Sequence, residues 1–116
     1  MHATHVIFCT CPDDRTARDL AAALVERRLA ACVNVLPGIR SIYRWQGEVQ
    51  EEGETLLVVK TGRAAYPALE SWLAEAHPYD VPEIIALPVD KGLPAYLDWV
   101  VQETAEPNGN SNEKSP

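Results

Sequence analysis

The sequence has no long apolar run, few positive charges and too few cysteines for a disulfide framework. No segment approaches the roughly 20 apolar residues that a membrane-spanning helix needs, so a membrane partner is not expected. The first residues contain neither a basic region nor the apolar core that a secretion signal carries. We therefore expect a soluble protein that is located in the cytoplasm.

Positive charge is scarce, with ten Lys and Arg against seventeen Asp and Glu and a net charge of −7 at pH 7. A surplus of negative charge repels phosphate backbones, so nucleic acid is not an expected partner. The same charge attracts cations weakly, but it does not by itself create a binding site.

The cysteines number only three, namely Cys9, Cys11 and Cys32. Their odd number and uneven spacing predict reduced thiols in a reducing compartment. The sequence also lacks a Ser-His-Asp order, an HExxH motif and zinc-spaced cysteine pairs, so we do not expect an enzyme. A thiol-dependent enzyme with His77 as the base is the least supported alternative.

What is present suits one globular domain. The chain has 116 residues, of which 47% are hydrophobic, enough for a single core. We assign this domain to residues 1–105. Residues 106–116 are polar, and we predict a disordered tail there.

Hydrophobic periodicity predicts alternating strands and helices. Strands are expected at 4–10, 31–45, 49 to about 61 and 83–89, with helices at about 14–28, 64–76 and from 94 onward. The pair Arg27 and Arg28 is expected to close the first helix, in keeping with the helix dipole. Pro37 and Gly38 predict a bulge in an edge strand, and the residues around Gly47 a tight turn. In the last helix, the buried side is predicted to carry Tyr96, Leu97, Val100 and Val101.

This order, β-α-β-β-α-β followed by a helix, predicts an α+β fold of the ferredoxin-like type. The strands are apolar on both faces: Leu57 and Val59 alternate with the equally apolar Leu56 and Val58. A sheet face in contact with water would alternate apolar and polar residues. Three helices on one side cannot cover both faces, so we expect another copy of the chain to cover the second face.

Several stretches closely resemble the CutA family of divalent-cation-tolerance proteins. They are ERRLAACVN at 26–34, PG at 37–38, SIYRWQG at 41–47, VKT at 59–61, HPYDVPEI at 77–84 and YLDW at 96–99. The resemblance spans about residues 4–103. It implies a homotrimer similar to the PII signalling proteins, no established enzymatic activity, and binding of copper or other divalent cations. A sensor or adaptor that binds a small ligand or a protein in intersubunit clefts is the alternative that the family suggests.

The resemblance makes Cys32 and His77 candidate metal ligands, with Cys9 as a further one. Cys11 departs from the family pattern, and it places a second thiol two residues from Cys9, on the same side of a strand. Soft thiolates suit Cu(I). A free cysteine is also commonly a small buried hydrophobic residue, and a histidine before proline can instead hold a turn through a carbonyl group.

Tyr43, Arg44 and Trp45, near the tip of the predicted hairpin, are expected to form part of the trimer interface. The alternative is that Arg44 and Lys60 line an anion pocket between subunits. No glycine-rich phosphate loop supports that alternative.

Overall fold

The computed structural model describes residues 3–106, so the predicted tail lies almost entirely outside the described residues. The elements are β1 (Thr4–Cys11), α1 (Asp14–Glu26), β2 (Cys32–Trp45), β3 (Glu48–Gly62), a 3₁₀ turn η1 (Arg63–Ala65), α2 (Tyr66–Ala76), β4 (Ile85–Pro88) and α3 (Pro94–Glu103). The predicted α+β order is confirmed. No helix among these residues is long and apolar enough to cross a membrane.

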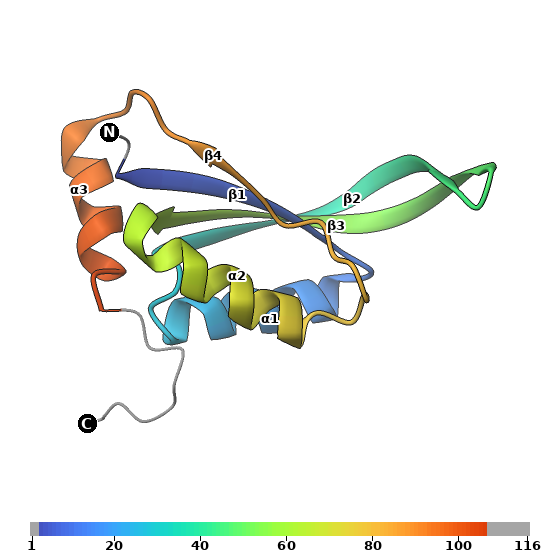
Figure 1. The fold of residues 1–116 in the computed structure, drawn as a ribbon, viewed down its shortest axis with the longest axis horizontal. Helices are drawn as coiled ribbons and strands as arrows, with labels where there is room; N and C mark the ends of the chain where they lie inside the picture. The colour runs from blue at the N-terminus through green and yellow to red at the C-terminus, as the bar shows by residue number, and fades with distance from the viewer. Residues whose placement is uncertain (1–2, 107–116) are drawn as a thin grey trace.

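The four strands form one antiparallel sheet in the order β2-β3-β1-β4. β3 therefore separates β1 from β2, which is the split arrangement of the ferredoxin-like fold. Helices α1 and α2 lie side by side on one face of this sheet (Figure 1). The core between the helices and the sheet is built from strand residues such as Ile7, Leu57 and Val59 and helix residues such as Leu24 and Leu69, all fully buried.

The third helix departs from the prediction that three helices share one face. α3 lies at the end of the sheet, beside the start of β1 (Figure 1), where the Thr104 hydroxyl accepts a hydrogen bond from the Gly62 amide at 3.0 Å. Its buried side is also narrower than predicted: Val100 is fully buried, Leu97 and Val101 are half-buried, and Tyr96 is 40% exposed. A helix at the end of a sheet has only a narrow strip of strand residues to pack against.

Helix α1 begins as predicted but ends earlier. The Asp13 carboxylate caps it by accepting the Thr16 amide at 2.7 Å. The helix ends at Glu26, and Arg28 has a φ of 59°, so the predicted basic last turn is wrong. This left-handed residue directs the amides of Leu29 and Ala30 onto the Leu24 carbonyl and lets both side chains enter the core.

Strands β2 and β3 form a long hairpin that extends beyond the helices (Figure 1). Its turn places Gln46 and Gly47 at φ values of 51° and 82°, the left-handed conformation of a tight two-residue turn. The register shifts between Leu36 and Ile39, which confirms the predicted bulge on an edge strand.

The face of the sheet opposite α1 and α2 is apolar and is covered by neither of these helices. We call this the open face; its apolar residues are Val6, Phe8, Leu36, Leu56, Val58, Ile85 and Leu87, which range from half-buried to exposed. β4 is shorter than predicted, since its pairing with β1 spans only Ile85 to Pro88. The predicted apolar character of both faces of the sheet is thus confirmed.

Candidate metal centre

Three potential metal ligands converge under the helices at one end of β1. The sulfurs of Cys9 and Cys11 and a ring nitrogen of His77 all lie within 4.8 Å of one another, and all three residues are buried. The two cysteines project to the same face because they are two positions apart on a strand. Their partners across the ladder, Leu57 and Thr55, are also buried, so the thiols point into the interior.

His77 is held by two hydrogen bonds. Its Nε2 lies 2.9 Å from the Thr10 carbonyl oxygen, which can only accept, so Nε2 carries the proton and donates. Its Nδ1 accepts from the Tyr79 amide at 3.1 Å. The imidazole therefore joins the turn after α2 to β1 at the residue between the two cysteines. This contact is the turn-holding role that the sequence left as an alternative to metal binding.

The two thiols influence each other's protonation. The hydrogen bond between them lowers the pKa of Cys11 and raises the pKa of Cys9, which burial raises further. The carboxylates of Glu54, Glu83 and Asp13 add smaller electrostatic contributions that also raise these pKa values. Cys11 therefore loses its proton before Cys9 does. The surrounding negative charge disfavours a bare thiolate and favours a cation.

Glu54 and Tyr79 form a polar wall beside the three ligands. The Tyr79 hydroxyl donates to Glu54 Oε2 at 2.6 Å, and the Tyr79 ring lies 4.8 Å from the His77 ring, centroid to centroid. Partial burial and this hydrogen bond raise the pKa of Tyr79. Sequence reasoning missed Glu54, because only the strand register brings it to the turn after α2.

Cys32 does not join this group. It pairs with Lys60 across the ladder, whereas Cys9 pairs with Leu57, an odd number of positions away on the same strand. Cys32 therefore lies on the open face, opposite the other two thiols. There it adjoins Tyr96, whose pKa is raised first by burial and then by this thiol. The structure thus brings together three of the four candidate ligands and separates the fourth.

The predicted interface residues lie at the exposed tip of the hairpin. Trp45 is 60% exposed, and Arg44 donates to the Gly47 carbonyl at 3.4 Å. Tyr43 is also exposed. On β3, the partner of Arg44 is Val49, which lies eleven positions from Lys60, about 36 Å at the usual rise of a strand. Within one chain, Arg44 and Lys60 cannot line the same anion pocket.

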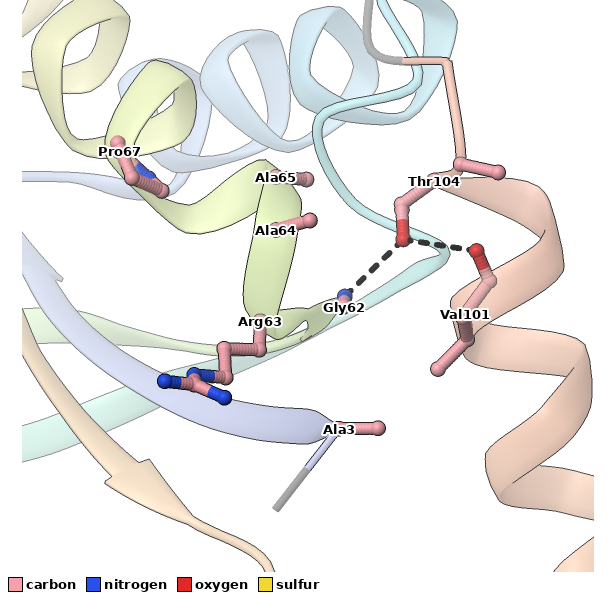
Figure 2. Close-up of a pocket in the computed structure, with 9 residues that line it drawn as sticks. Ala3, Gly62, Arg63, Ala64, Ala65, Pro67, Val101 and Thr104 are labelled. Carbon is pink, nitrogen blue, oxygen red and sulfur yellow. Dashed lines mark hydrogen bonds between the residues drawn. The ribbon is translucent and has the colours of Figure 1, made fainter. Parts of the chain in front are cut away.

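A separate hollow of about 520 Å³ lies between η1 and the end of α3 (Figure 2). Its walls include Ala64, Ala65, Pro67 and Val101, and its charged residue is Arg63. Thr104, the polar residue on its rim, already bonds Gly62. A hollow with apolar walls and a cationic side chain offers a metal ion no ligands, so the Cys9, Cys11 and His77 group is the better candidate for a cation site.

Comparison with known proteins bears on this geometry. The family model described as CutA1 divalent ion tolerance protein matches residues 5–103. The chain belongs to the CutA1 family. Among its CutA relatives, the divalent-cation tolerance protein CutA of Thermus thermophilus is 54% identical over 99 residues, covering 85% of this chain and 96% of that protein. The mouse protein CutA is 49% identical over 109 residues, and the chain covers 61% of its length.

Solved CutA1 structures share the fold. The Thermus thermophilus structure has a TM-score of 0.85 at 53% identity, covering 87% of this chain and 98% of that one. The CutA1 structure from Oryza sativa has a TM-score of 0.87 at 41% identity, covering 90% of this chain and 96% of that one. The resemblance to divalent-cation-tolerance proteins, stated from the sequence, is therefore confirmed.

Proposed function

We propose that this CutA1-family protein binds copper or another divalent cation, with Cys9, Cys11 and His77 as its ligands. The observation that carries the proposal is the convergence of two buried thiols and a buried imidazole within 4.8 Å. Thiolates and imidazoles are the ligands that copper and zinc prefer. The ion tolerance that names the family and its relatives supports the same conclusion.

Binding an ion there requires specific changes in the chain's own groups. Both thiols give up their protons, because the thiolate is the ligand form of cysteine. His77 gives up one of its two hydrogen bonds, since both ring nitrogens are engaged. The negative charge of Glu54 and Glu83 then offsets the charge of the ion.

Native mass spectrometry of the reduced full chain, with about one equivalent of copper per chain, tests this function. We expect one ion per chain in the wild type and in Cys32→Ala, whose thiol lies on the other face. We expect no tightly held ion in Cys9→Ala. A wild-type chain that stays bare would refute the proposal. The PII-like sensor or adaptor would then be the better-supported function, and for it a small ligand should raise the melting temperature more than any metal does.

We further propose that the protein assembles as a homotrimer through its open face. The apolar residues Ile85 and Leu87 are about half exposed in a single chain, and Ile42, Trp45 and Val49 are exposed on the hairpin. Burial of such surface in another copy removes it from water. The mass of the native assembly is the measurement: three chains are expected, and a monomer would contradict the assembly.

We also propose that the protein is cytoplasmic and has no catalytic activity. Three free cysteines suit a reducing compartment. Cys9 is a poor nucleophile because its neighbours and its burial raise its pKa. Fractionation of the source cells tests the location. Slow alkylation of Cys9 near pH 7 is expected, and fast alkylation would support the thiol-dependent enzyme.

A further inference from the structure

The Cys9–Cys11 pair cannot protect itself by closing a disulfide. Two positions along a strand separate the Cβ atoms by about 6.6 Å, whereas a disulfide needs about 3.5–4.5 Å. At Cys9 and Cys11, β1 is paired with β3, so it cannot pucker to close this gap without losing ladder hydrogen bonds to that strand. The two sulfurs remain separate donors, aimed at the same buried point.

The spacing of the sulfurs suits a single ion held between them. A zinc–sulfur bond is about 2.3 Å long, so two such bonds on opposite sides of an ion span about 4.6 Å. The sulfurs lie within 4.8 Å of each other, so an ion between them requires little movement of either side chain. The third candidate, His77, is already committed to Thr10 and Tyr79 through both of its ring nitrogens.

This donor set is incomplete for harder ions. Zinc in a structural site takes four ligands, and the group supplies three at most. Calcium and magnesium take six or more oxygens, and the nearby Glu54 carboxylate already accepts the Tyr79 hydroxyl. In contrast, a soft monovalent cation such as Cu(I) is satisfied by two thiolates in a dry setting.

We propose that Cys11 makes this a two-thiolate site for soft monovalent cations, Cu(I) above all, with His77 as the residue that positions β1 beside it. This inference rests on the proposed metal-binding function and deepens it by naming the class of ion. For such an ion the two thiolates suffice as ligands, so His77 keeps both of its hydrogen bonds and does not act as the third ligand. On binding, each thiol releases one proton and each sulfur donates an electron pair to the ion. Copper enters and stays as Cu(I), so no electron transfer is needed.

The test is an anaerobic titration of the full reduced chain with Cu(I) against a coloured Cu(I) chelator, with Zn(II) and Mg(II) as competitors. The wild type should bind one Cu(I) per chain and keep it in excess Zn(II). Cys11→Ala should bind at least about a hundredfold more weakly, since even an outer-sphere change costs ten- to a hundredfold. Cys32→Ala is the matched control and should keep wild-type affinity. Circular dichroism should show that both variants are folded.

X-ray absorption of the Cu(I)-loaded wild type requires no variant. Two sulfur neighbours at short distance are expected. Undiminished Cu(I) affinity in Cys11→Ala, a single sulfur neighbour, or displacement of Cu(I) by equimolar Zn(II) would overturn the inference while leaving metal binding at Cys9 and His77 intact. A wild-type chain that binds no ion would instead refute the proposed function itself.

Discussion

Replacing His77 by alanine should destabilise the protein even when no metal is present. The substitution removes the imidazole donor from the buried Thr10 carbonyl, which keeps only the long 3.9 Å contact with the Cys9 thiol, and it leaves the half-buried Tyr79 amide without its acceptor. An unsatisfied buried polar group costs about 1–3 kcal/mol, and water can partly replace the partner of the second. The Tyr79 ring also loses its 4.8 Å contact with the imidazole. We expect a loss of about 2–4 kcal/mol in the free energy of unfolding.

Urea unfolding followed by circular dichroism, with chelator present and at one fixed protein concentration, measures this loss. With a urea dependence of about 2 kcal/mol per molar, the midpoint should fall by about 1–2 M. A fixed concentration is needed because an oligomer's stability depends on it.

Two conservative variants separate the two hydrogen bonds. His77→Gln extends an amide toward Thr10 and should recover part of the loss through that bond. His77→Asn presents an oxygen to the Tyr79 amide and should recover only the stability that this second hydrogen bond contributes. If His77→Ala stays within about 0.5 kcal/mol of the wild type, the inferred positioning role is wrong.

Three further predictions follow from other contacts. Gly62→Ala should cost about 1–3 kcal/mol, because its Cβ would lie 2.8 Å from Thr104 Oγ1, whereas Gly53→Ala, facing only the flexible end of Arg40, should cost little in the same urea assay. The pKa of Tyr79 is raised above its ordinary value of 10, so the stability that its protonated hydroxyl contributes is complete below pH 10 and is lost as the pH rises toward the raised pKa. Tyr79→Phe should therefore flatten the alkaline fall of the melting temperature. An unchanged slope of melting temperature against pH would contradict this prediction. Ile85→Glu, at a position 50% exposed on the open face, should lower the mass of the native assembly, whereas Val25→Glu, at a position 43% exposed on α1, should not; equal masses would refute assembly through that face.

Local patterns were sufficient to predict the order of elements. The alternation in β1 and β3, the cap at Asp13 and the break at Pro37 and Gly38 each act within a few residues, so the sequence contains them directly. The end of α1 was missed because Arg28 adopts its left-handed conformation to bury Leu29 and Ala30, a gain that appears only once the sheet exists. The position of α3 depends equally on tertiary contacts.

The candidate site was predicted only in part. The spacing of Cys9 and Cys11 places both on one face of any strand, so their proximity is a local property. The separation of Cys32 depends on strand register, because a shift of one position would exchange its face. The contact of His77 with Thr10 joins residues 67 positions apart, and no short-range pattern encodes it.

The candidate metal ligands and the apolar surface proposed for assembly lie on opposite faces of the sheet. Cys9 and Cys11 point toward the helices, whereas Ile85 and Leu87 point away from them. A partner copy seated on the open face therefore reaches neither thiol of the site, and each chain carries its own complete group of donors. Cys32 lies on the same face as the proposed interface. The resemblance makes it a candidate ligand, but the strand register places it away from the candidate metal site. Assembly and ion binding should consequently be separable by mutation, and a variant that loses one should retain the other.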